Sequence, residues 1–224
     1  SQGQSLMGIL SNYATDSLVT ASCRIAFRYL SPQRDQGREI AEKIALASQF
    51  AQADPYRAAT HNKGIFNGVD AILIATGNDW RAIEAGAHAY ASRDGRYQGL
   101  SSWRLDLETE ELVGEMTLPM PVATKGGSIG LNPRVALSHE LLGNPSAKEL
   151  AQVIVSIGLA QNFAALKALV STGIQQGHMK LQAKSLALLA GASESEVAPL
   201  VERLIADKTF NLETAQRYLE NLRS

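Results

Sequence analysis

Apolar and polar positions in the first quarter of the chain predict one strand followed by one helix. Residues 19–28 alternate with a period of two, as in a half-buried strand. Residues 38–53 carry apolar side chains at helical spacing. We expect this helix to end at Asp54-Pro55, because the residue before a proline disfavours the helical conformation.

The middle of the chain predicts two more helices and a hairpin. The helices are expected over 62–75 and 79–91, with a break at Thr76-Gly77 and with Asn78 as the N-cap of the second. Residues 97–119 contain two alternating stretches around an acidic turn, which is the pattern of a β-hairpin.

Helices fill the rest of the chain. Asn132-Pro133 begins a short one, and a capping box of Ser146 and Glu149 begins a long one that extends to about Val170. The long helix is apolar nearly all round, so we expect it to be buried on most sides. Three amphipathic helices follow, with caps at Ser193 and Asn211, over 178–189, 194–206 and 212–222. This order of elements favours an α+β fold, helix-rich with a central buried helix and a small sheet, over a doubly wound sheet.

Composition excludes several classes of protein. The 224 residues are 45% hydrophobic with a formal net charge of -1, so a packed core is possible and no overall field attracts nucleic acid or an anionic membrane. Cys23 is the only cysteine, which excludes an internal disulfide, and its alternating surroundings favour a buried place in the strand. No uninterrupted apolar run approaches the length of about 20 residues that a membrane span needs. No signal peptide is evident either, so we expect a cytoplasmic protein.

Lys63 is the first candidate for chemistry. It shares a helix face with Asn67, and the turn after that helix can bring Asp79 back toward it. A lysine held in this way can donate to a developing oxyanion, while the carboxylate adjusts its charge and position. On spacing alone, a solvated lysine and an acid favoured by the start of a helix explain the same residues.

Three weaker candidates lie elsewhere. His178 follows a segment with two glycines and could be a mobile general acid, although a partly exposed histidine near a helix start is the simpler interpretation. The glycine-rich residues 125–130 could offer amides to a phosphate, but a sharp turn after the hairpin explains them better. Arg57 could pair with a substrate carboxylate or simply lie on the surface. The other histidines have no metal-ligand spacing, so no metal site is expected.

Several short stretches together resemble one family, 3-hydroxy-3-methylglutaryl-coenzyme A (HMG-CoA) reductase, in its short soluble bacterial (class II) form. The resemblance extends over nearly the whole chain, and the block that contains Lys63 and Asp79 is its most specific part. The matching stretches are 9–14, 54–64, 75–82, 158–162 and 177–179.

This resemblance implies a four-electron reduction of (S)-HMG-CoA to mevalonate and coenzyme A, with two hydrides from NADPH or NADH, in the mevalonate pathway of isoprenoid biosynthesis. By motif position, Lys63 is similar to the lysine that stabilises the carbonyl oxygen, and Asp79 to its hydrogen-bonded partner. His178 is similar to the acid that protonates the departing thiolate from a C-terminal flap. Substrate-contacting or network positions of the family correspond to Arg57, Asn67 and Asn162.

The same resemblance implies an incomplete enzyme. The catalytic glutamate of the family and its Asp-Ala-Met-Gly-x-Asn dinucleotide motif belong to the N-terminal half, and neither motif occurs in the chain. Residues 1–53 would be the C-terminal part of a ferredoxin-like small nicotinamide-binding domain, 54–174 part of the large substrate-binding domain, and 175–224 a three-helix flap. We therefore expect a chain that is inactive without its N-terminal half and that belongs to a homodimer or higher oligomer. The alternative is a non-catalytic helical or coenzyme A-binding module.

Overall fold

The computed structural model describes residues 3–33, 36–127, 129–171 and 174–223, and for 174–178 it describes the backbone only. The chain divides into two compact units, Ser1–Val170 and Ser171–Ser224. Each unit has its own hydrophobic core, so each is described by itself.

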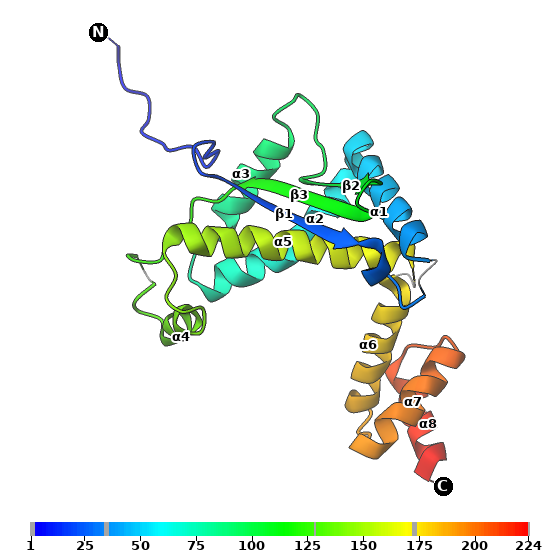
Figure 1. Ribbon diagram of the computed structural model, residues 1–224. Coiled ribbons are helices and arrows are strands. Elements are labelled where there is room, and N and C mark those ends of the chain that lie inside the picture. Colours follow the sequence, from blue (N-terminus) through cyan, green and yellow to red (C-terminus); the bar gives the residue numbers. More distant parts are fainter. Residues whose placement is uncertain (1–2, 34–35, 128, 172–173, 224) are drawn as a thin grey trace. The chain divides into compact units, whose positions relative to one another are not determined.

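The first unit contains a three-stranded antiparallel sheet in the order β1-β3-β2 (Figure 1). β1 (Leu18–Ala26) pairs with β3 (Glu111–Pro119), which pairs in turn with β2 (Ser101–Asp106) across the predicted hairpin. Alternate side chains of β1 pack against the core, and Cys23 is one of them, as the pattern predicts. Burial raises the pKa of the Cys23 thiol, so the thiol stays protonated and packs as a small apolar group.

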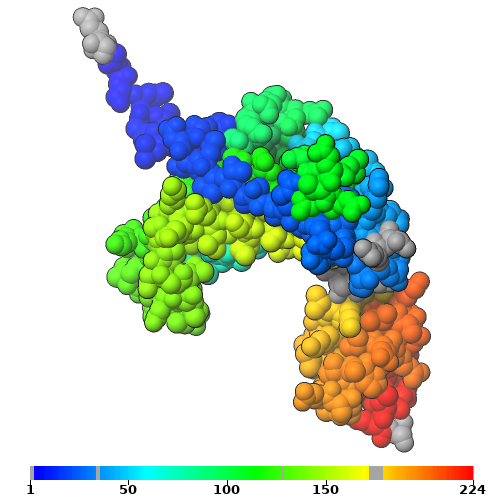
Figure 2. Space-filling model, in the orientation of Figure 1, coloured from blue at the N-terminus to red at the C-terminus, as the bar shows by residue number. Residues whose placement is uncertain are grey.

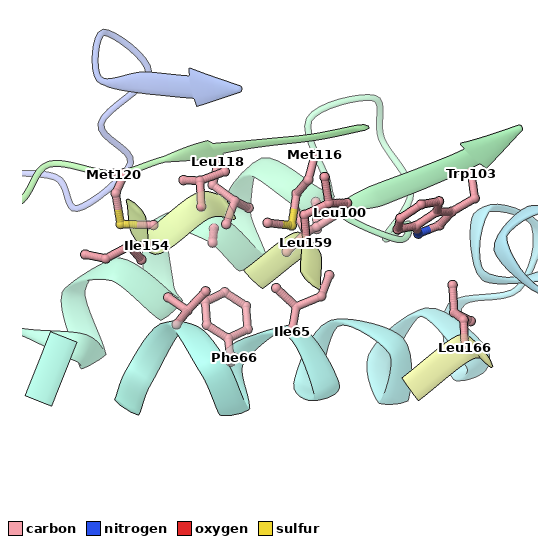
Figure 3. Packing of buried hydrophobic residues seen from close by; sticks show 14 of the residues in the cluster. Ile65, Phe66, Leu100, Trp103, Met116, Leu118, Met120, Ile154, Leu159 and Leu166 are labelled. Atoms are coloured by element: carbon pink, nitrogen blue, oxygen red, sulfur yellow. The ribbon is translucent and has the colours of Figure 1, made fainter. Parts of the chain in front are cut away.

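Five α-helices complete the described part of this unit. They are α1 (Gln36–Ala53), α2 (Pro55–Ala75), α3 (Trp80–Ala91), α4 (Pro133–Leu141) and α5 (Ala147–Val170). Figure 3 shows the core between the sheet and the helices, where Met116 of β3 and Leu159 of α5 lie close to Ile65 of α2. The sheet and the two long helices α2 and α5 therefore share one layer of buried side chains.

The predicted start of α2 at residue 62 is wrong by seven residues. Asp54 is the N-cap of this helix, and its carboxylate accepts hydrogen bonds from the amides of Tyr56 and Arg57 at 3.2 and 3.1 Å. Pro55 takes the first helical position, where the amide proton that proline lacks is not needed. The same dipeptide that ends α1 thus begins α2, and Arg57 lies inside a helix.

α5 begins at the predicted capping box but is less buried than its composition suggests. Glu149 accepts from the amide of Ser146 at 2.8 Å, and the Ser146 hydroxyl accepts from the amide of Glu149 at 3.3 Å. The prediction that this helix is buried on most sides is wrong, since the α5 residues Ile157 and Leu169 are 41% and 47% exposed. α5 is long and apolar enough to cross a membrane, and 33% of its most apolar window is buried in the protein. Core helices of water-soluble proteins pass the same test, so this helix is weak evidence of a membrane span.

The segment before β1 is also apolar and exposed. Residues 3–10 make no strand or helix, and the N-terminal segment extends away from the rest of the unit in Figure 2. Their exposed apolar side chains are Leu6, Met7, Ile9 and Leu10.

The second unit contains three helices, α6 (Ile174–Leu189), α7 (Glu194–Ala206) and α8 (Leu212–Arg223). The predicted caps are confirmed: Ser193 and Glu196 form a capping box, and Asn211 accepts from the amide of Thr214 at 2.8 Å. α6 begins four residues earlier than predicted. The core of the unit is formed by Ala183, Ala187, Leu200, Val201, Leu204, Ala215 and Leu219.

Residue 53 does not mark a division between compact units. β1 and α1 share a hydrophobic core with α2, β3 and α5. The three-part division at residues 53 and 174 concerns whole enzymes of the family, and it stays a prediction.

Two carboxylates meet between α2 and α3. Asp70 lies against Glu84, and its Oδ1 is buried with no hydrogen-bond partner among the described residues. Burial, with the charge and hydrogen bond of Glu84, raises the pKa of Asp70 from 3.8 to about 6. Between about pH 4 and 6, Asp70 therefore keeps its proton in the folded protein and loses it in the unfolded chain. The free energy of unfolding falls as the pH rises through this range.

Replacing this carboxylate should stabilise the protein in a pH-dependent way. Asp70→Asn should raise the melting temperature at about pH 7.5, because it removes a charge that is held beside Glu84 and away from water. The gain should shrink as the pH falls through about 6 and be small near pH 4, where the folded protein carries Asp70 protonated. Calorimetry across this range measures the shift, with the exposed Asp16→Asn as the matched control. An equal gain at every pH would contradict the assignment.

Candidate functional site

The candidate residues of α2 lie on different sides of the helix. Lys63 and Asn67, predicted to share a face, are both exposed. His61 lies on the buried side with 3% of its surface exposed, and Arg57 is partly buried. The lysine side chain is thus exposed to solvent, while the histidine two residues earlier faces the core.

Asp79 caps α3. Its carboxylate accepts from the amides of Arg81 and Ala82 at 3.1 and 3.2 Å, so Asp79, and not the predicted Asn78, is the N-cap. The carboxylate also lies 3.7 Å from Nε of Arg81. Within the part of the chain that the structure describes, no hydrogen bond or ion pair joins Asp79 to Lys63. Both are exposed on the same unit, and their pairing stays a prediction.

Hydrogen bonds fix the turn that connects these two residues. The Asn78 side chain accepts from the amide of Ala123 at 2.8 Å and donates to its carbonyl at 3.1 Å. The Thr76 hydroxyl donates to the carbonyl of Ile72 at 2.7 Å, which closes the end of α2. Gly77 has a φ of +72°, which favours glycine. The start of α3, and Asp79 with it, is therefore held firmly relative to α2.

Asn162 lies in a buried polar network, and not at an open surface. Its Oδ1 accepts from Nε1 of Trp103 at 2.7 Å and from the hydroxyl of Ser101 at 2.8 Å. Its amide nitrogen is 3.2 Å from Nε2 of His61, which is 2.7 Å from the Ser101 hydroxyl oxygen. Of the two roles that the resemblance allows for Asn162, these contacts favour the network role.

This network is the part of the site that sequence reasoning missed. Its members come from α2, β2 and α5, and the hydrogen bonds span 40 to 61 residues of sequence. The available signal was the presence of His61 and Asn162 among apolar positions of two long helices. Buried polar side chains need partners, so two of them facing one core indicate a shared network.

Electrostatics keep His61 neutral. Burial and the nearby charge of Arg57 lower the pKa of His61 from 6.5 to about 4. Burial also lowers the pKa of Arg57, whose guanidinium nevertheless remains charged at neutral pH.

The two other candidates have different outcomes. His178 lies in α6 of the second unit, and its side chain is outside the described residues. In the glycine-rich loop, the described residues 125–127 are exposed, with positive φ at Gly126 and Gly127, which fits a sharp turn. Among the described residues, no group of three or more His, Cys, Asp or Glu side chains is placed to hold a metal ion.

A cavity of about 430 Å³ lies away from the candidate residues. It is formed by the start of β1, the segment after β3 and the start of α5. Lys148 and Gln152 line it together with mostly apolar side chains. None of the residues predicted for chemistry contributes to its wall.

Comparison with known proteins identifies relatives over most of the chain. Among curated proteins, it is 51% identical over 188 residues to the 3-hydroxy-3-methylglutaryl-coenzyme A reductase of Archaeoglobus fulgidus, which covers 84% of this chain and 43% of that protein. It is 38% identical over 181 residues to a probable 3-hydroxy-3-methylglutaryl-coenzyme A reductase of Borreliella burgdorferi, which covers 81% of this chain and 42% of that protein.

Solved structures give the same result. The chain is 94% identical to a 3-hydroxy-3-methylglutaryl-coenzyme A reductase from Streptococcus pneumoniae, with a TM-score of 0.76 over 99% of this chain and 53% of that one. It is 95% identical to a class II reductase from the same organism bound to NADPH in open conformations, with a TM-score of 0.75 over 100% of this chain and 54% of that one. The chain thus spans about half the length of the relatives it matches. The family model described as hydroxymethylglutaryl-coenzyme A reductase matches residues 1–183, and the chain belongs to that family.

Proposed function

We propose that the chain is the C-terminal portion of a class II HMG-CoA reductase, which reduces (S)-HMG-CoA to mevalonate and coenzyme A with two NAD(P)H. The observation that carries the proposal is the block of Lys63, Asn67 and Asp79, exposed on α2 and at the start of α3 in a member of the reductase family. The NADPH that is bound to the class II relative supports a nicotinamide cofactor for the complete enzyme.

Lys63 is the residue that meets the developing charge. Hydride addition to a thioester or aldehyde carbon leaves negative charge on the oxygen, and an ammonium aimed at that oxygen stabilises it. The side chain of Lys63 is exposed and flexible enough to reach a bound carbonyl. A nicotinamide cofactor would supply the hydride when bound, while Lys63 and a substrate-facing Asn67 would orient and polarise the carbonyl.

Asp79 and His178 complete the set within this chain. The amides of α3 hold the Asp79 carboxylate near the turn, where it can tune the charge of Lys63 once the site is assembled. His178 protonates the departing thiolate, and residues 175–224 form the flap that carries it. Arg57 has a planar fork that suits a substrate carboxylate.

The remaining domain assignments follow from the resemblance. Residues 54–174 belong to the large domain, and the complete enzyme is a homodimer with the active site at the subunit interface. For residues 1–53, the resemblance implies a place in a small nicotinamide-binding domain. The shared core of β1 and α1 with α2 and α5 argues against a separate domain there.

The chain alone should not oxidise NADPH in the presence of HMG-CoA, because its sequence lacks the dinucleotide motif and the catalytic glutamate motif of the family. Co-expression with the N-terminal half should give activity, followed by the absorbance of NADPH. Intact mass spectrometry checks that no N-terminal peptide co-purifies with the chain. Steady turnover by the verified single polypeptide would contradict the proposal, and coenzyme A binding without reduction by the complemented protein would favour the non-catalytic module.

Lys63→Ala in the complete enzyme should abolish reduction of both HMG-CoA and mevaldehyde, with kcat lower by about a hundredfold or more. The side chain is exposed, so the melting temperature should change little. Lys43→Ala, at an exposed lysine of α1, is the matched control and should leave both reactions intact. Activity of Lys63→Ala within about tenfold of the parent would show that this lysine does not stabilise the oxyanion.

A further inference from the structure

Arg57 and His61 lie one turn apart on α2, and each has polar atoms without a partner. Nδ1 of His61 is buried and makes no hydrogen bond within the described chain, in a side chain that is 3% exposed. The partly buried guanidinium of Arg57 likewise has no hydrogen bond or ion pair among the described residues. Residues four apart on a helix are neighbours, so these two groups can reach each other.

The network at the other ring nitrogen decides what Nδ1 can do. Trp103 Nε1 can only donate, which fixes Asn162 Oδ1 as an acceptor. Ser101 donates its single hydroxyl proton to the same oxygen. The Ser101 oxygen must then accept from Nε2 of His61, at 2.7 Å, so the ring proton is on Nε2. The Asn162 amide nitrogen, at 3.2 Å from Nε2, can only donate, so with the proton on Nε2 this longest contact is not a hydrogen bond.

A neutral ring with its proton on Nε2 carries a lone pair on Nδ1. That lone pair is a hydrogen-bond acceptor, and leaving a buried acceptor without a donor costs free energy. The adjacent cation supports this state, since a second ring proton would place two positive charges one turn apart in a poorly hydrated site. Arg57 lacks the complementary partner, because its guanidinium has five N–H donors and no acceptor for them among the described residues.

We propose that His61 is a positioning residue for Arg57, with Nδ1 accepting one N–H of the guanidinium in the complete enzyme. This rests on the proposed function, in which Arg57 contacts the substrate. With one N–H bonded to Nδ1, the guanidinium is held in one orientation and presents its remaining N–H groups as a fork to the substrate carboxylate. Through Ser101 and Asn162, the orientation of Arg57 is then set by β2 and α5.

The test is a double-mutant cycle in the complete enzyme, read as KM for HMG-CoA and kcat. His61→Phe keeps a ring but removes the lone pair, so KM should rise about tenfold while kcat stays within about threefold. His61→Gln supplies an acceptor again and should recover part of the loss. In the Arg57→Ala background, His61→Phe should raise KM little further, because the partner is already gone.

His88→Phe is the matched control. His88 is a partly buried histidine of α3 whose Nδ1 lies 2.9 Å from the Tyr97 hydroxyl, so its loss should leave KM unchanged. The same rise in KM for His61→Phe with and without Arg57 would overturn the proposal, as would a fall in kcat at constant KM. If His61→Phe does not fold, as judged by circular dichroism, His61→Gln and His61→Asn take its place in the same cycle. An unsubstituted complete enzyme that fails to reduce HMG-CoA contradicts the proposed function instead.

Discussion

The close approach of α2, α5 and β3 is the constraint on which the first unit depends. A Cβ at Gly158 would lie 2.8 Å from the Met116 side chain and 2.9 Å from that of Val69, and one at Gly68 would lie 3.1 Å from Ile157. Glycine at both positions lets the two helices and the strand pack this closely. The same close packing brings Asn162 of α5 and His61 of α2 to the Ser101 hydroxyl, so the apolar contact and the buried polar network stabilise the same arrangement.

Elements with local signals could be predicted from the sequence. The alternation of β1, the hairpin of β2 and β3 and the capping boxes at Ser146 and Ser193 depend on residues a few positions apart, and all are observed. The start of α2 was missed because a proline both ends one helix and suits the first position of the next. The burial of α5 was overestimated because composition tells which side chains are apolar and not what covers them.

The candidate site divides in the same way. Lys63 and Asn67 lie on one face of α2, as their spacing of four residues predicts, and the structure shows that this face is exposed. Asn78 is not the cap because its side chain bonds to the distant Ala123, and the internal place of Asn162 depends on partners in β2, neither of which a local pattern encodes. The functional roles of these residues came from family resemblance, because spacing by itself favoured an ordinary solvated lysine and a helix-start acid.

The corner between α1 and α2 has a mechanical consequence. Asp54 is the single residue between helices of 18 and 21 residues, and its carboxylate is bonded to the first amides of α2 while proline fixes the next backbone torsion. A joint with so few free torsions behaves as a stiff elbow. A displacement of α1 must therefore rotate the start of α2, and Arg57 is three residues beyond Asp54. Movement of α1 would thus change the direction of the Arg57 guanidinium without any contact with Arg57 itself.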